Sequence, residues 1–178
     1  MPVVMEIIKY VLIMAAVTAI MKYLANQSKK SAAKDAQGNT ILILPALYGV
    51  MGIGGCILGF GIMIWGIIDF DREAFGAICF LFIMFGGLGA VMLSFRHIYR
   101  IKLTPEGIVK RSVMGQYKSM AWEDIKAVTY SRLMTEVKMS DGTNFIKCYV
   151  HVIGFESLVY ELSNRLNMSR AEMGIPEL

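Results

Sequence analysis

Charged residues are scarce in the first half of this 178-residue chain. None occurs from Ile41 to Ile68 or from Ala74 to Phe95, and over the whole chain they make up 18%, against about 25% in soluble domains. Hydrophobic residues make up 56%. This balance excludes an ordinary soluble protein and indicates an α-helical membrane protein. Residues 96–178 differ, because nine acids and twelve bases are spread evenly through them, as in a soluble domain.

The two uncharged runs are each long enough to cross a bilayer. A hydrocarbon core about 30 Å thick needs about 20 apolar residues in a helix, and the runs hold 28 and 22 residues. We therefore predict a transmembrane helical hairpin over residues 41–96. Pro45 falls in the opening turn of its first helix, where proline is tolerated.

The N-terminal segment, residues 1–25, has a shorter uncharged stretch, and three interpretations compete for it. A cleaved signal peptide is disfavoured because no small-residue cleavage site follows the apolar core. An amphipathic helix lying in the membrane surface is disfavoured because the polar residues form no coherent stripe. A transmembrane helix is favoured, provided that Glu6, Lys9 and Lys22 reach the interface. The sequence alone does not decide between a span and a surface helix.

Basic residues are distributed unevenly around the predicted spans. Most of them lie in residues 26–40 and after residue 96, whereas the N-terminus and the turn at residues 69–73 contribute only Lys9 and Arg72. By the positive-inside rule, this pattern predicts a multi-pass protein of the inner (plasma) membrane with its N-terminus outside. The polar linker 26–40 and the C-terminal half are then cytoplasmic, and the linker is expected to be flexible.

The turn at residues 69–73, with the sequence DFDRE, separates the two long apolar runs. Its alternating acids resemble a cation-binding set, but Ca²⁺ takes six or more oxygen ligands and Arg72 lies among the acids. We interpret this stretch as the solvated external turn of the hairpin, because charged side chains are costly in lipid. We predict no metal and no cofactor.

Glycine is abundant in both predicted spans of the hairpin. Gly55 and Gly59 form a GxxxG pair in the first span, and Gly86 and Ala90 provide small residues in the second. Small residues let helix backbones approach closely in lipid. The pattern predicts a tight intramolecular hairpin, with a homo-oligomer interface as the alternative. A conduction pathway is disfavoured, because no charged residue interrupts either span.

The chain lacks the short motifs of the common catalytic and metal sites. Its three cysteines, Cys56, Cys79 and Cys148, include no C-x-x-C pair, and His97 and His151 belong to no H-E-x-x-H. No serine lies in G-x-S-x-G, and no lysine follows the glycine-rich stretch as a phosphate loop requires. We therefore predict that the protein is not an enzyme. Nucleic-acid binding is also disfavoured, because acids are interleaved among the bases.

From Tyr99 onward the hydrophobic residues recur with the period of β-strands. Turn signals at Pro105 and at Asp141-Gly142 separate such runs. A helix is predicted from Gly154 to Asn167, with one apolar face. The predicted strands cover residues 99–103, 107–113, 118–122, 126–131, 135–140 and 143–150. The fold class is therefore transmembrane α-helices followed by an α+β domain at residues 97–170, with a tail at 171–178.

Four stretches of this domain, LTPEGIVKRS, AWEDIKAV, DGT and GFESLVYEL, resemble bacterial pleckstrin-homology-like (PH-like) domains, which often follow two membrane spans. The similarity covers about residues 95–168. The residues that match are Trp122, Asp124, Ile125, Gly154, Phe155 and Leu158. The resemblance implies an antiparallel β-barrel or sandwich capped by one C-terminal helix. Only six strands are evident and a seventh is not, so an open or abbreviated barrel is expected.

The domain is expected to bind rather than to catalyse. We predict a core that contains Trp122, Ile125, Phe155, Leu158 and Leu162. Candidate residues for binding lipid or a partner are Lys102, Lys110, Arg111 and Lys118 on the first three strands and their loops. The first hypothesis is a non-enzymatic, membrane-anchored PH-like domain that binds a protein partner or the anionic membrane surface. The alternative is an accessory subunit of a transporter or channel complex, associating through its glycine-rich helices.

Overall fold

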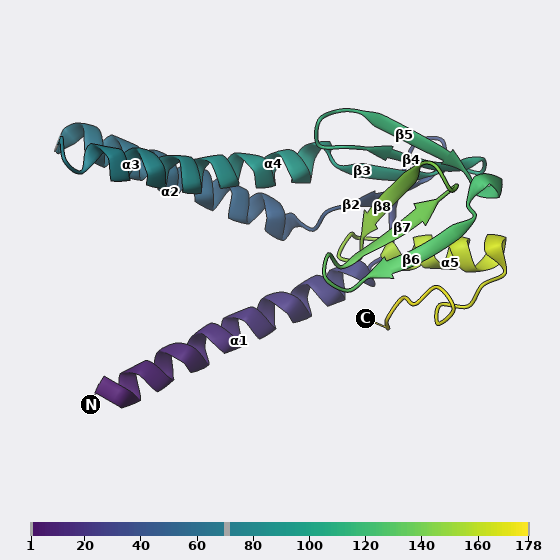
Figure 1. The fold of residues 1–178 in the computed structure, drawn as a ribbon, viewed down its shortest axis with the longest axis horizontal. Helices are drawn as coiled ribbons and strands as arrows, with labels where there is room; N and C mark the ends of the chain where they lie inside the picture. Colours follow the sequence, from purple (N-terminus) through teal and green to yellow (C-terminus); the bar gives the residue numbers. More distant parts are fainter. Residues whose placement is uncertain (1, 70–71, 178) are drawn as a thin grey trace.

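The computed structural model describes residues 2–69 and 72–177 and has an elongated helical part and a compact domain. Three helices are long and apolar enough to cross a membrane. They are α1, α2, and a third helix that consists of α3, a π-helical turn and α4. Their bounds are α1 Pro2–Ser28, α2 Ala46–Ile68, α3 Phe75–Phe82, the π-helical turn Ile83–Gly87 and α4 Leu88–Ile98. In Figure 1, α2 lies along α3 and α4, whereas α1 projects separately. The prediction of three apolar helices is confirmed.

The turn predicted at residues 69–73 is described only in part. The helix α2 ends at Ile68, and α3 begins at Phe75, so a connection between the two helices does fall here. Phe70 and Asp71, which were predicted to belong to this external turn, lie outside the described residues.

Glycine residues bring α2 and the third helix into backbone contact. A Cβ atom added at Gly59 would lie 2.6 Å from the backbone nitrogen of Gly86, and one added at Gly55 would lie 3.1 Å from the Cα of Gly89. Either side chain would displace the neighbouring helix, so these positions tolerate only glycine without a shift. The predicted intramolecular role thus applies to Gly55, Gly59 and Gly86. Ala90, expected in the same contact, is exposed, and Gly89 contacts α2 instead.

The domain consists of two antiparallel sheets and a C-terminal helix. The first sheet has the order β1-β2-β3-β4-β5, and the second has the order β6-β7-β8. The element bounds are β1 Ala33–Lys34, β2 Thr40–Ile43, β3 Arg100–Leu103, β4 Gly107–Arg111, β5 Tyr117–Ala121, β6 Ala127–Ser131, β7 Glu136–Ser140, β8 Phe145–Tyr149 and α5 Phe155–Leu166. All six predicted strands and the predicted helix are present, with ends that differ by a few residues.

The segment predicted as a flexible linker is instead part of this domain. Strand β2 pairs with β3, with Ile43 opposite Arg100, and a single bridge joins Ile43 to Ile153 beside α5. Leu42 and Leu44 are buried in the core. The prediction of a flexible linker at 26–40 is therefore wrong, as is the start of the transmembrane hairpin at residue 41. In the sequence, β2 cannot be separated from the apolar run that forms the first helix of the hairpin, because hydrophobic α2 follows β2 after only two residues.

A hairpin turn at residues 35–39 connects β1 to β2, so that the two strands pair in antiparallel fashion. The Asp35 carboxylate accepts hydrogen bonds from the backbone N–H groups of Gln37 (2.9 Å) and Asn39 (2.8 Å). Gly38 adopts a φ of +84°, which glycine tolerates without strain. The polar, small residues that suggested flexibility are thus the residues that a tight turn needs.

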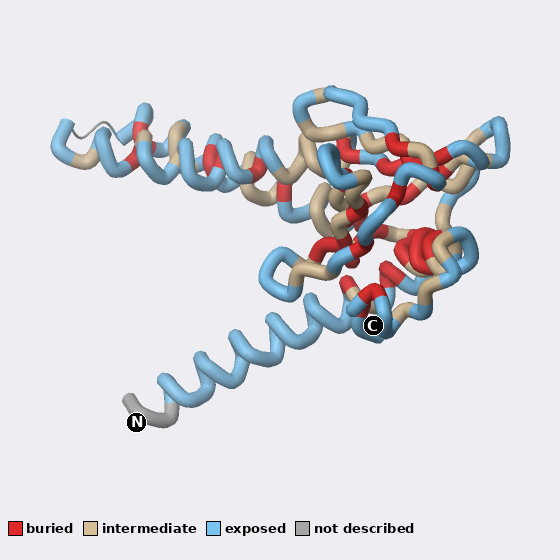
Figure 2. Tube along the Cα trace, turned by 45° about the vertical axis from the view of Figure 1, so that its right-hand side comes forward, coloured by how far each residue is buried: buried red, intermediate tan, exposed pale blue. Residues whose placement is uncertain are grey.

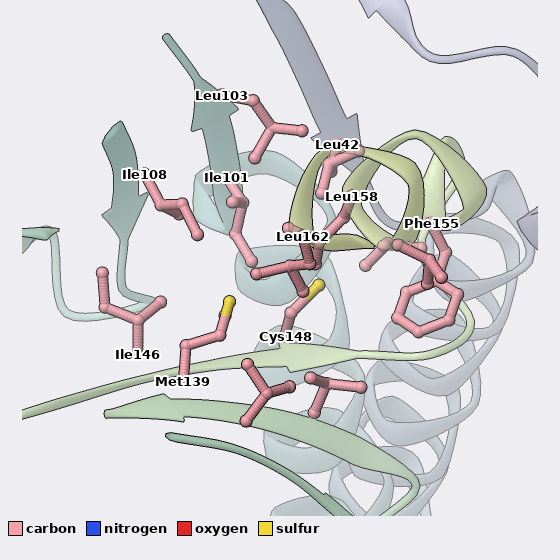
Figure 3. Packing of buried hydrophobic residues seen from close by; sticks show 14 of the residues in the cluster. Leu42, Ile101, Leu103, Ile108, Met139, Ile146, Cys148, Phe155, Leu158 and Leu162 are labelled. Carbon is pink, nitrogen blue, oxygen red and sulfur yellow. The ribbon is translucent and has the colours of Figure 1, made fainter. Parts of the chain in front are cut away.

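The core of the domain lies between the two sheets and α5, whose buried face carries Phe155, Leu158 and Leu162 (Figure 3). Trp122 and Ile125, at the corner between β5 and β6, are also buried. The Trp122 indole N–H donates a 2.8 Å hydrogen bond to the Thr104 carbonyl, so the polar atom of this buried ring has a partner. All five residues predicted to form the core are buried.

The segment predicted as a C-terminal tail, residues 171–178, is described up to residue 177 and contributes two side chains to the domain core. Met173 and Ile175 are buried, whereas the other described residues of this segment are exposed. Figure 2 shows that α1, by contrast, is exposed along almost all of its length. The Arg170 guanidinium contacts the Glu156 carboxylate at 2.8 Å and donates to the Pro176 carbonyl at 2.7 Å. These contacts hold the chain that follows α5 against the first turn of that helix, so the domain extends beyond α5.

Candidate binding surface

Lys102 does not join the other predicted binding residues. Its ammonium group forms an ion pair of 2.6 Å with Asp35, across the β2–β3 ladder from the turn that precedes β2. The hydrogen bond from Lys102 is the main reason that the pKa of Asp35 is lowered to about 2. Lys102 therefore ties the segment before the helical hairpin to the strand after it, and its charge is already compensated.

Lys110 and Lys118, also predicted, do come together. They are directly opposite each other on β4 and β5. The Lys110 ammonium donates a 2.7 Å hydrogen bond to the backbone carbonyl of Lys147 and lies 5.1 Å from the centre of the Tyr99 ring. Burial lowers the pKa of Lys110, because a charged group loses hydration there. Arg111, the fourth predicted residue, is exposed and lies over the ring of Tyr117.

Lysines from both sheets lie close to the aromatic ring of Phe145. The ammonium groups of Lys118, Lys138 and Lys147 lie 5.3, 4.5 and 5.7 Å from the ring centre. Such distances allow the negative face of the ring to attract each cation. We call Lys110, Lys118, Lys138 and Lys147 the lysine cluster. It forms where β8, at the edge of its sheet, meets β4 and β5 of the other sheet.

One carboxylate contributes directly to the charge balance of the lysine cluster. Glu136 is nearly buried and forms an ion pair of 2.6 Å with Lys147. No ion pair within the described part of the chain involves Lys110, Lys118 or Lys138. The cluster therefore carries a net positive charge at neutral pH.

A cavity of about 220 Å³ opens beside the cluster. At about 30 Å³ for each water molecule in the liquid, it has room for several waters or for a small hydrated anion. Ser112 and Gln116 add a hydroxyl and an amide to its wall, and Phe145 supplies the apolar side. The wall thus combines cations with neutral hydrogen-bond donors, which suits a phosphate or carboxylate group.

The sequence did not single out Lys138, Lys147 or Phe145. Their contribution depends on the second sheet crossing the first, which sequence spacing does not reveal. One local signal was available, because Lys138 and Lys147 flank the Asp141-Gly142 turn at distances that place them opposite each other. Two lysines paired across a predicted hairpin would have marked this surface.

Among the described residues, the titratable groups outside the lysine cluster form neither a metal site nor an activated thiol. No group of three His, Cys, Asp or Glu side chains able to hold a metal occurs in residues 2–69 and 72–177. Burial raises the pKa of the Cys148 thiol to about 12, so this thiol stays protonated and is a poor nucleophile at neutral pH. Burial also lowers the pKa of His151. That the protein is not an enzyme remains a prediction.

Comparisons with protein-family models, with curated proteins and with solved structures found no match for this chain. The resemblance to PH-like domains therefore rests on the sequence motifs quoted above.

Proposed function

We propose that this protein is a non-enzymatic, membrane-anchored module whose PH-like domain binds the anionic surface of its own membrane through the lysine cluster. The fold assignment is supported by β2, which adds to β3–β5 and β6–β8 the seventh strand that the sequence did not reveal. It is also supported by Trp122, Phe155 and Leu158, which match the family motifs and lie in the core. The helical hairpin is then an insertion between β2 and β3.

The observation that carries the binding proposal is that like charges are paired across strands. Arg100 lies opposite Arg111, Lys110 opposite Lys118, and Lys138 opposite Lys147. Like charges directly opposite each other destabilise a sheet. Two of these three pairs lie in the lysine cluster. There the Glu136 carboxylate offsets part of the repulsion through Lys147, and a bound anion would offset the rest. Violations of a local rule tend to mark functional surfaces.

The orientation of the chain in the membrane is part of this proposal. The excess of Lys and Arg in residues 22–34 and after residue 95 supports a cytoplasmic domain. There it faces the leaflet that carries anionic lipids, where each nearby Lys or Arg contributes about 1 kcal/mol of attraction. A cysteine at Ser119 should resist an impermeant maleimide in whole cells, while one at Arg72 should react. Labelling at residue 119 alone would reverse the orientation.

Binding to the membrane surface is better supported than the alternative function, an accessory subunit of a transporter or channel complex. That alternative relied on glycine-rich helices packing against a larger partner. Gly55, Gly59 and Gly86 are instead used in the contact within the hairpin. Gly54 and Gly61 do face open space, but a row of small residues alone does not identify a partner.

The proposal is tested on the full-length protein in lipid nanodiscs. A donor dye is attached to a cysteine at Ser119, next to Lys118, with Cys56 and Cys79 replaced by alanine, and headgroup-labelled lipid is the acceptor. Energy transfer should be stronger with about 30% phosphatidylglycerol than in pure phosphatidylcholine. Loss of two lysine contacts, at about 1 kcal/mol each, corresponds to roughly a 30-fold weaker association. Lys118→Ala with Lys138→Ala should therefore abolish the difference between the two lipids.

The matched control removes two other exposed lysines, at Lys34 and Lys126, which lie outside the cluster. This variant should behave like the wild type. Energy transfer that is equal in the two lipids would reject the anionic surface as the ligand. An acidic protein segment would then be the better candidate for the same cluster.

A further inference from the structure

The domain has two ends, and the strand registers determine which turns lie at each. Helix α4 runs into β3 at Arg100, and Arg100 is opposite Arg111, so the turn of residues 112–116 lies beside this junction. Tyr149 contacts the Phe95 ring of α4 at 6.5 Å between centroids and is opposite Glu136. The turn of residues 132–135 therefore lies on the same side. We call this the helix end of the domain, and Figure 1 shows both turns on the side from which the helices project.

The opposite end holds the hairpin turns that follow β1, β3 and β7, and each of the last two shares a strand, β4 or β7, with a turn at the helix end. Residues 104–106 connect β3 to β4 beyond Leu103, and residues 141–144 connect β7 to β8 beyond Ser140. We call this the distal end. Because both pairs of turns belong to the same two sheets, their compositions can be compared directly.

The turns at the helix end carry exposed apolar side chains at their tips. Met114 is 88% exposed, Leu133 is 89% exposed and Met134 is 58% exposed. Arg111 and Arg132, both exposed, flank these tips. The distal turns carry Pro105, Glu106 and the polar stretch from Asp141 to Asn144. Turns in water are normally rich in polar residues, so only the helix end departs from this rule.

Local hydrogen bonds hold the apolar tips in place. In the first turn the Gly115 N–H donates to the Ser112 carbonyl at 2.9 Å, and Gly115 has a φ of +77°. In the second turn the Met134 N–H donates to the Ser131 hydroxyl at 3.4 Å, and Thr135 has a φ of +47°. Met114 and Leu133 thus remain exposed because their turns are closed tightly beneath them.

We propose that these two tips insert into the lipid leaflet from which the helical hairpin emerges, and so seat the domain on the bilayer. The occupant that covers Met114, Leu133 and Met134 is the lipid itself, because the connected helices place a bilayer at this end of the domain. Arg111 and Arg132 then lie at the level of the lipid phosphates, as basic residues flanking an apolar anchor do. This inference rests on the membrane-anchored function proposed above but does not require the lysine cluster to bind anions.

The test places an environment-sensitive NBD dye at three positions of the full-length protein in nanodiscs. Cysteines replace Met114, Leu133 and Thr143 one at a time, and Thr143 is the matched control because it lies at a distal turn. Cys56 and Cys79 are replaced by alanine, while the buried, protonated Cys148 is retained. Spin-labelled acyl chains serve as quenchers from the lipid, and iodide serves as the quencher from water.

Emission from residues 114 and 133 should shift to the blue, and spin-labelled lipid should quench it at least twofold more than emission from residue 143. This should hold in phosphatidylcholine as well as in phosphatidylglycerol, since insertion of apolar tips does not depend on lipid charge. Equal quenching by iodide at all three positions would overturn the inference. A blue shift without quenching by lipid, lost at one protein per nanodisc, would mean that a second copy covers the tips, and would also overturn it.

A second variant keeps the proposal testable without a dye at the tips. Met114→Asp with Leu133→Asp should reduce energy transfer from Ser119 to labelled headgroups in both lipids, whereas Thr143→Asp should not. Because all three side chains are exposed, melting in detergent should stay the same. By contrast, a failure of the lysine-cluster proposal alone removes the dependence on phosphatidylglycerol and leaves quenching at residues 114 and 133 unchanged.

Discussion

The helical hairpin and the domain hold together in opposite ways. In the hairpin, glycines such as Gly59 and Gly86 meet backbone to backbone, while large side chains such as Ile57 and Phe60 point outward. In the domain, large side chains such as Phe155 and Ile101 fill a shared core and are fully buried. Lipid is as apolar as leucine, so burying leucine there contributes little and close backbone contact contributes more. In water the opposite holds, because burying large apolar side chains away from water is the main favourable contribution to folding.

The helix α1 differs from both regions. Almost all of its described side chains are exposed, and only Leu24, Gln27 and Ser28 in the last turns are buried. It is attached to the domain at one end and has no glycine contact with the hairpin. Over most of its length α1 is therefore not held by packing against the other described residues, and it is long and apolar enough to cross a membrane.

The largest expected effect comes from removing β2, which would break the domain as a unit. Residues 100–178 alone lack Leu42 and Leu44, two fully buried core residues, as well as the strand that pairs with β3. Each Leu→Ala change in a core typically costs about 2–5 kcal/mol, and a domain has only about 5–15 kcal/mol of stability. The fragment should therefore be unfolded by circular dichroism and NMR.

The matched control restores β2 without the membrane helices. Residues 29–45 are joined to residues 99–177 by a short glycine-containing turn, which can span the gap because Ile43 and Arg100 are opposite each other. This fusion should be folded and rich in β-structure. Cooperative unfolding of the fragment 100–178 by itself would show that β2 is dispensable and would contradict the prediction.

The next largest effect concerns the hairpin and uses two glycines on one helix. A side chain at Gly59 would clash with the Gly86 backbone, whereas one at Gly61 would meet no atom within 4 Å. Overpacking typically costs about 1–3 kcal/mol, so Gly59→Leu should lower the melting temperature in detergent and Gly61→Leu should not. If the two variants melt alike, the glycine contact does not hold the hairpin together.

The smallest effect lies at the surface of the domain, where water competes for the same groups. The folded-state pKa of Asp35 is about 2, below its ordinary value of 3.8, mainly because of Lys102. Stability from this carboxylate is therefore fully present above about pH 4 and is lost as the pH falls toward 2. Melting followed between pH 5 and 2 should decline less steeply in Asp35→Asn than in the wild type.

Lys102→Met provides the partner control for that measurement, since it removes the main cause of the lowered pKa. It should flatten the same part of the pH profile as Asp35→Asn. If both variants lose stability between pH 4 and 2 as steeply as the wild type, other carboxylates are responsible for the acid sensitivity.

The parts of this protein that sequence could predict are those that depend on neighbours along the chain. Long apolar runs indicated the helices, alternating residues indicated six strands, and the spacing of Phe155, Leu158 and Leu162 indicated the buried face of α5. The glycine pattern also identified Gly55, Gly59 and Gly86, because small residues must recur on one helix face to form a contact. Ala90 was misplaced because spacing does not show how two helices are rotated against each other.

Tertiary structure alone decided what joins distant segments. By itself, the sequence determined an apolar helical part and an antiparallel β-domain, because helix length and strand alternation are local consequences of hydrophobicity. It could not determine that β2 pairs with β3 across the inserted hairpin, since strand pairing depends on partners that are remote along the chain. Nor could it bring Lys110 and Lys118 to Lys138, Lys147 and Phe145, because that surface exists only where two sheets meet. The candidate binding surface is thus a product of sheet packing rather than of any continuous motif.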